Sequence, residues 1–128
     1  MDREELIRHA MSARENSYSP YSRFRVGAAL LCRDGEVYEG CNIENRAYGP
    51  TNCAERTAFF KAVSEGKREF SAIAIAGGEE ELIWCYPCGV CRQVMAEFCD
   101  PDTFEIICAK STEEYKVFTL EELLPNMF

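Results

Sequence analysis

The sequence predicts an α/β protein: a three-layer α/β/α sandwich around a mixed sheet of about five strands. Short apolar runs typical of buried strands alternate along the chain with longer segments of helical periodicity. One pair of runs is joined by Asp34-Gly35, a turn signal for an antiparallel hairpin, so the sheet is expected to be mixed. A chain of 128 residues suits one domain, 1–128, and is too short for two ordinary ones.

The first elements are a helix and a hairpin. Asp2 and Glu5 are spaced as a capping box, and apolar residues behind them recur at helical spacing until about Asn16. A loop is expected around 19–22. The strands of the hairpin are expected at 26–31 and 36–43, with a further loop from 44 to 52.

Three more helices are expected after this loop, the last of them short, with apolar strands between them. The segment 53–63 is rich in helix formers and is followed by Gly66, a plausible C-terminal stop. Pro87 stands where helices often begin. The remaining elements, in chain order, are a strand at 71–76, a helix at 88–98, strands at 104–109 and 115–119, and a short helix at 120–124.

Composition disfavours several function classes. The net charge of −8 arises from 14 basic and 22 acidic side chains, and no Lys/Arg cluster of the kind that binds phosphate backbones is present, so no nucleic-acid partner is expected. No apolar run is long enough to span a membrane. No signal peptide is visible behind the charged N-terminus, which predicts a cytoplasmic location.

The spacing of the eight cysteines is more informative than their number. Cys88 and Cys91 form a C-x-x-C pair at the start of a predicted helix, where positions i and i+3 share one face and the helix N-terminus favours thiolates. Cys53 adds a third thiol at the start of another predicted helix. Three protein ligands leave a fourth zinc position for water, and the Glu55 carboxylate lies close enough in sequence to move its protons.

Two arginines follow the cysteine segments. Three thiolates on one zinc ion leave a net charge of about −1, and nearby guanidinium groups would reduce it. Arg56 and Arg92 are therefore candidates for tuning the charge near zinc, although ordinary surface or structural roles are the alternative for both.

A second C-x-x-C register, from Cys85 to Cys88, leaves a closed four-thiolate site open as an alternative. Cys85 precedes Pro87 and should lie in extended chain, which disfavours it as a ligand. A thiol–disulfide oxidoreductase built on the C-x-x-C pair would give Cys53 no role. The other four cysteines have apolar surroundings and are expected to be buried as small hydrophobic residues: Cys32, Cys41, Cys99 and Cys108.

The motifs Cys53-Ala54-Glu55-Arg56 and Pro87-Cys88-Gly89-Val90-Cys91-Arg92-Gln93 closely resemble those of the cytidine deaminases, of the small homotetrameric zinc-dependent type. Other segments are similar to the family in the same order, namely 19–22, 24–30, 40–45, 121–125 and the terminal Phe128. The resemblance covers nearly the whole chain. It implies hydrolysis of cytidine and 2′-deoxycytidine to uridine and 2′-deoxyuridine with release of ammonia, as in pyrimidine salvage.

The resemblance also implies roles for individual residues. One zinc per chain would be held by the three thiols, and Glu55 would move protons between water, the base N3 and the departing amine. Phe24 would pack against the pyrimidine, the backbone at Ala54 would contact it, and Asn42 with Glu44 would bind the ribose 3′-hydroxyl. Residues that would reach a neighbouring subunit's site in a homotetramer are Tyr48 and Phe128. His9, the single histidine, is expected on the surface of the first helix and not as a ligand.

The sequence departs from the family pattern at Arg46, where a small residue is common, and at Pro50, which stiffens the loop before Cys53. Arg46 either adds a positive charge near the entrance of the site or points to solvent. Both departures bear on substrate preference or the subunit contact, and the zinc chemistry is expected to survive them. Two rival functions remain open: deamination of a related aminated heterocycle, and a structural zinc module that binds a protein partner. The second rival predicts four closed ligands and no role for Glu55.

Overall fold

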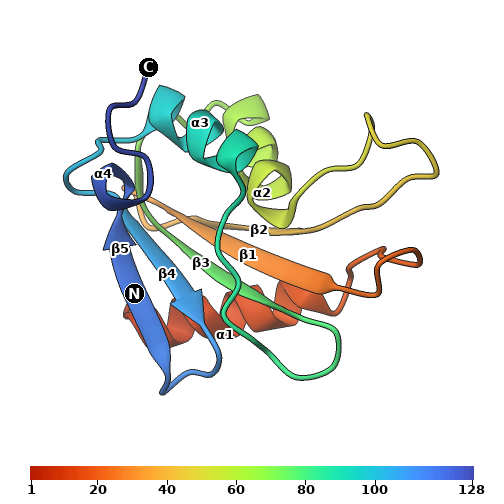
Figure 1. The fold of residues 1–128 in the computed structure, drawn as a ribbon. Helices are drawn as coiled ribbons and strands as arrows, with labels where there is room; N and C mark the ends of the chain where they lie inside the picture. The colour runs from red at the N-terminus through yellow and green to blue at the C-terminus, as the bar shows by residue number, and fades with distance from the viewer.

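A computed structural model describes residues 1–128. Five strands and four helices follow one another along the chain (Figure 1). In order they are α1 (Arg3–Arg14), β1 (Arg25–Cys32), β2 (Val37–Cys41), α2 (Ala54–Ser64), β3 (Phe70–Gly78), α3 (Gly89–Phe98), β4 (Glu105–Ala109), β5 (Tyr115–Thr119) and α4 (Leu120–Leu123).

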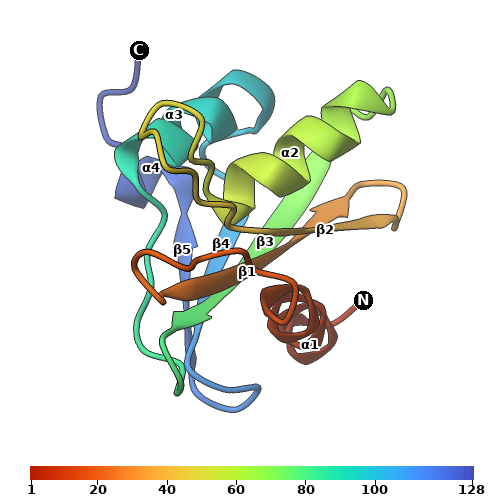
Figure 2. The same ribbon diagram turned by 90° about the vertical axis from the view of Figure 1, so that its right-hand side faces the viewer.

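The strands form one mixed sheet in the order β2-β1-β3-β4-β5. Strands β3 and β4 are parallel, because α3 carries the chain back across the sheet between them, and every other neighbouring pair is antiparallel. Helix α1 covers one face, while α2, α3 and α4 cover the other (Figures 1 and 2). The predicted α/β/α sandwich with a mixed sheet is therefore confirmed.

Each sheet face buries its own apolar cluster. The smaller cluster lies under α1 and includes Leu6, Ile7 and Ile107. The larger one lies under α2, α3 and α4, and is centred on Phe59, which packs edge-on against Phe70 with ring centroids 5.1 Å apart. The N-terminal ends of α2 and α3 pack on this larger cluster.

The glycine turn signals and the cap of the first helix lie where the sequence predicts them. Gly35, in the β1–β2 hairpin, and Gly66, just after α2, both have positive φ angles. The Asp2 side chain caps α1 by accepting from the Glu5 amide. The complete capping box of the chain lies elsewhere, at Thr119 and Glu122, where it starts α4.

Most strand ends lie within one residue of the sequence prediction, and two differ from it by two residues for identifiable reasons. Strand β2 ends at Cys41 instead of 43, because the Asn42 side chain takes over the pairing by accepting from the Val26 amide and donating to the Phe24 carbonyl. Strand β3 continues through Gly78, where a Cβ atom would lie 1.9 Å from the Glu81 carbonyl oxygen. Glycine there permits the tight return of the chain toward α3.

The cysteines outside the candidate site follow the prediction with one exception. Cys32, Cys99 and Cys108 are buried, but Cys41 is half-buried because β2 is an edge strand of the sheet. His9 lies on α1 as expected, partly exposed, with Nδ1 2.6 Å from a carboxylate oxygen of Glu39. None of the helices combines the length and the apolar composition that crossing a membrane requires.

Candidate active site

Three thiols converge where the N-terminal ends of α2 and α3 meet. Cys53 is the N-cap residue of α2, Cys88 is the N-cap residue of α3, and Cys91 lies in the first turn of α3. The Sγ atom of Cys88 is 3.7 Å from that of Cys53 and 3.6 Å from that of Cys91. All three Sγ atoms lie within 4.8 Å of one another, close enough to hold a single metal ion. The structure thus brings together the three thiols that the spacing indicated.

The chemistry of this donor set fits zinc. The interaction with Cys91 and the hydrogen bond from Arg56 Nη2, 3.3 Å from Sγ, lower the pKa of Cys53 to about 5 despite its burial. The hydrogen bond with Cys53 and burial raise the pKa of Cys91, because a proton shared by neighbouring sulfur atoms favours one thiolate at a time. Thiolates are the form that binds zinc, and an ion with two positive charges stabilises them together.

Arg56 contacts the thiol cluster, whereas Arg92 does not. Burial alone would lower the pKa of Arg56, but the sulfur atoms of Cys53 and Cys91 raise it and keep the guanidinium charged. The Arg92 guanidinium donates to two backbone carbonyls instead, at Pro87 and Leu123, and to no sulfur atom.

Cys85 lies beside the thiol cluster without joining it. Burial raises the pKa of Cys85 to about 12, so its thiol stays protonated where that of Cys53 ionises. A Cβ atom on Gly77 would lie 2.8 Å from the Cys85 sulfur and 3.2 Å from a ring carbon of Phe24, so a glycine leaves room for both side chains. The arrangement favours three metal ligands over a closed set of four.

A cavity of about 220 Å³ opens onto the thiol cluster. The Glu55 side chain lines it from the first turn of α2, with 4% of the residue exposed. Burial raises the pKa of Glu55 to about 7, close to the pH at which a proton carrier works best. The cavity therefore presents a buried carboxyl group of near-neutral pKa next to a metal-binding cluster.

The proposed nucleoside-binding residues line the same cavity: Phe24, Asn42, Glu44 and Ala54. Asn42 Oδ1 accepts from the Ser17 hydroxyl and the Val26 amide, 2.9 Å away for the latter, and Nδ2 donates one hydrogen to the Phe24 carbonyl at 2.7 Å. The second Nδ2 hydrogen has no protein acceptor. These contacts hold the amide rigidly and leave one donor for a ligand.

Glu44 is held by the loop that precedes β1. One carboxylate oxygen accepts from the backbone amides of Tyr21 at 3.0 Å and Ser22 at 3.1 Å, and the other accepts from the Ser22 hydroxyl. Together these hydrogen bonds lower the pKa of Glu44, so the group is a carboxylate near neutral pH. The sequence places Ser22 only in a loop, because nothing in the local pattern shows that this loop folds back onto Glu44, 22 positions later.

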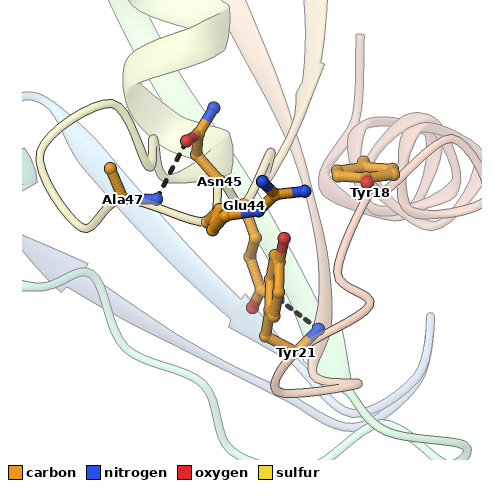
Figure 3. A pocket seen from close by; sticks show the side chains of 6 residues that line it. Tyr18, Tyr21, Glu44, Asn45 and Ala47 are labelled. Atoms are coloured by element: carbon orange, nitrogen blue, oxygen red, sulfur yellow. Dashed lines mark hydrogen bonds between the residues drawn. The ribbon is translucent and has the colours of Figure 1, made fainter.

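A separate hollow of about 510 Å³ lies next to this cavity and shares only Glu44 with it (Figure 3). Its other lining residues are Tyr18, Tyr21, Asn45, Arg46 and Ala47, with Asn45 fixing the loop by accepting from the Ala47 amide. None of the three thiols lies in it, so it is not the reacting centre. Arg46 therefore stands outside the thiol-lined cavity, on the far side of Glu44.

Two of the predicted residues lie outside the cavity of their own chain. Tyr48 is 98% exposed at the tip of the loop before α2, and Phe128 is fully exposed at the end of the chain. Met127, next to Phe128, does pack against the larger core cluster. The C-terminal segment is thus anchored to its own chain through Met127, and only the last residue, Phe128, projects into solvent.

Comparison with known proteins agrees with this geometry. The profile described as the cytidine and deoxycytidylate deaminase zinc-binding region matches residues 1–107. A cytidine deaminase from Halalkalibacterium halodurans is 53% identical over 128 residues, which are 100% of this chain and 95% of that protein. The chain belongs to this deaminase family.

Solved structures in the family share the fold of this deaminase. The crystal structure of cytidine deaminase from Burkholderia pseudomallei superposes with a TM-score of 0.91 at 47% identity, with both chains covered completely. A blasticidin-S deaminase from Bacillus cereus is 30% identical over 110 residues, covering 81% of this chain and 76% of that protein. Zinc is the cofactor of this zinc-binding family, and the Cys53, Cys88 and Cys91 cluster has room for one ion.

Proposed function

We propose that this deaminase hydrolyses cytidine and 2′-deoxycytidine to uridine and 2′-deoxyuridine, with release of ammonia. The observation that carries the proposal is the placement of the buried Glu55 carboxyl beside three thiols, in a cavity that also presents Asn42 and Glu44. The Glu55 carboxyl and the thiols suit hydrolysis at a zinc ion, and the Asn42 and Glu44 side chains suit a sugar hydroxyl. The cytidine deaminases that resemble this chain at 53% and 47% identity support this substrate over other aminated heterocycles.

We assign the zinc ion to Cys53, Cys88 and Cys91, one ion per chain. When bound, zinc supplies an activated water by lowering the pKa of that water toward neutrality. Glu55 would take one proton from the attacking water and deliver it to the base N3, and would then take the second proton from the same oxygen and deliver it to the departing amine. Its near-neutral pKa suits a group that must both accept and donate within one turnover.

The remaining cavity residues orient the nucleoside. The free Nδ2 hydrogen of Asn42 and the carboxylate of Glu44 suit the acceptor and donor sides of one hydroxyl, which we assign as the ribose 3′-hydroxyl. The Phe24 ring packs against the pyrimidine, and the backbone at Ala54 contacts its polar edge. Arg56 offsets the negative charge of the thiolates.

We further propose a homotetramer in which each site is completed by Tyr48 and Phe128 of neighbouring subunits. Both aromatic rings are almost completely exposed in their own chain, and exposed apolar side chains of this size are typical of contact sites. The cavity of about 220 Å³ also needs a further wall if water is to be excluded from a bound nucleoside. Arg46 and Tyr48 line one surface hollow, and Pro50 stiffens the loop that carries Tyr48, so we place both Arg46 and Pro50 in this proposed interface region.

The whole chain then serves as one catalytic domain in pyrimidine salvage, and the free thiols suit a cytoplasmic location. All eight cysteines are unpaired, and three thiolate ligands require a compartment in which thiols stay reduced.

The test is zinc content measured together with cytidine turnover in a matched pair of variants. Cys53→Ala should lose both the ion and the release of ammonia, whereas Cys85→Ala should retain one zinc per chain and most of the activity. Each variant removes one partly buried thiol at the same end of the molecule, so the pair separates ligand loss from general destabilisation. Loss of zinc from the Cys85 variant would contradict the three-ligand assignment.

A further inference from the structure

Arg92 connects two segments of backbone that lie far apart in sequence. Its Nε donates to the Pro87 carbonyl at 2.7 Å, and its Nη1 donates to the Leu123 carbonyl at 2.7 Å. Pro87 is fully buried and immediately precedes the ligand Cys88. Leu123 is the last residue of α4, the helix that leads into the C-terminal segment 124–128. One guanidinium group therefore binds both the turn that presents Cys88 and the residue from which the C-terminal segment begins.

Different hydrogen bonds fix the two ends of α4. Its N-terminal end has the Thr119 capping box and a backbone hydrogen bond from Glu121 to the Pro101 carbonyl, and Leu120 is fully buried. The last carbonyls of a helix have no donors within the helix, and a cation is favourable there. Arg92 supplies both the donor and the cation to the Leu123 carbonyl. Figure 1 shows α4 beside α3, with the chain terminus leaving from α4.

We propose that Arg92 is a positioning residue that sets the direction of the C-terminal segment relative to the zinc-ligand turn. This inference rests on the proposed role of Phe128 in a neighbouring site. Arg92 then controls how well each subunit completes the site of its neighbour, while Arg56 alone meets the thiolates. A role for Arg92 in tuning the charge at zinc is the alternative that the experiment must exclude.

Arginine is needed for this bridge because its donors point in two directions from a rigid plane. Lysine retains the positive charge, but it has carbon where arginine has Nε, so a lysine ammonium that reaches Leu123 leaves the Pro87 carbonyl unpaired. Arg92→Lys therefore separates bridging from charge. Arg68→Lys is the matched control, because Arg68 also donates to two carbonyls near a helix end, Val63 and Lys67 at 2.8 Å each, on an exposed surface that follows α2.

The experiment compares full-length, zinc-loaded wild type, Arg92→Lys, Arg68→Lys, a chain lacking Met127 and Phe128, and the combination of Arg92→Lys with that truncation. We expect Arg92→Lys to raise KM for cytidine about tenfold, the effect of losing one hydrogen bond to a charged group. The zinc content and the pH dependence of kcat should stay unchanged, and Arg68→Lys should match wild type. The double variant should be no worse than the truncation alone, because both changes remove the same contribution.

Several outcomes would overturn the inference: an unchanged KM in Arg92→Lys, a shifted pH profile or lost zinc in that variant, or additive effects in the double variant. If the truncation alone leaves KM unchanged, the proposed role of Phe128 fails and the inference fails with it, while the assignment of the reaction stands.

A second variant reaches the same contact without altering Arg92, in case Arg92→Lys does not fold. Leu124→Pro removes the amide that donates to the Leu120 carbonyl and turns the Leu123 carbonyl away from Arg92. It should also raise KM about tenfold with an unchanged pH profile. Wild-type KM in a folded Leu124→Pro enzyme would contradict the proposal.

Discussion

Replacing Glu55 by glutamine tests the proposed chemistry most directly. The substitution preserves the shape of a side chain that is 4% exposed, and it removes only the ability to carry a proton. A positioned general acid or base typically contributes about 10²–10⁴-fold to a rate. Because Glu55 carries protons in both directions during one turnover, we expect kcat to fall by about 10⁴-fold, or about 5 kcal/mol of transition-state stabilisation.

The structure predicts that this loss is confined to the chemical step. The substituted glutamine side chain would keep the cavity filled and would not move Cys53 or Ala54, so the Glu55→Gln variant should retain one zinc per chain and should bind nucleoside. Zinc content by atomic absorption, nucleoside binding by calorimetry and ammonia release by a coupled assay measure the three quantities separately. Glu97→Gln on the exposed face of α3 is the matched control for the loss of one negative charge. Turnover of Glu55→Gln within tenfold of wild type would refute the assignment of Glu55 as the proton carrier.

Two further predictions concern the sugar and the subunit interface. A 3′-deoxy substrate should leave Asn42 and Glu44 without their ligand contact, at a cost of about 1–3 kcal/mol in kcat/KM, whereas 2′-deoxycytidine should lose much less; equal kcat/KM for all three nucleosides would remove both residues from the site. Mixing Glu55→Gln chains with chains lacking Met127 and Phe128 should restore part of the activity, because some sites then combine an intact Glu55 with an intact Phe128 from different chains. No recovery in mixtures shown to exchange subunits would contradict a shared site.

Much of the fold could be predicted because the local signals agree with the tertiary structure. The capping residue Asp2, the turn at Gly35 and the stop at Gly66 all mark elements whose backbone conformation depends on those residues. The errors occurred where a distant group competes with the local pattern. Strand β2 ends early because the Asn42 side chain pairs with Val26 and Phe24, a contact that no window of sequence contains.

The candidate site shows the same division between local and distant information. Cys53 precedes Arg56 by three residues, a spacing that places both on one helix face, and their contact at 3.3 Å follows from it. Arg92 follows Cys88 by four residues, so its spacing equally allows a contact with sulfur. The carbonyl of Leu123, which binds Arg92 instead, lies 31 residues further along the chain. Sequence spacing alone therefore could not distinguish the roles of the two arginines.

The different contacts of these arginines bear on how the cluster tolerates its charge. Three thiolates and one zinc ion carry a net charge of about −1, at a site where Cys91 is buried, Cys53 is half-buried and Cys88 is exposed. The N-terminal ends of α2 and α3 both face the cluster through Cys53 and Cys88, and each contributes a partial positive charge of about half a unit. Arg56 adds a full charge at hydrogen-bonding distance. These contributions offset the excess without Arg92, which leaves that guanidinium free to serve the backbone carbonyls that join the zinc-ligand turn to the end of the chain.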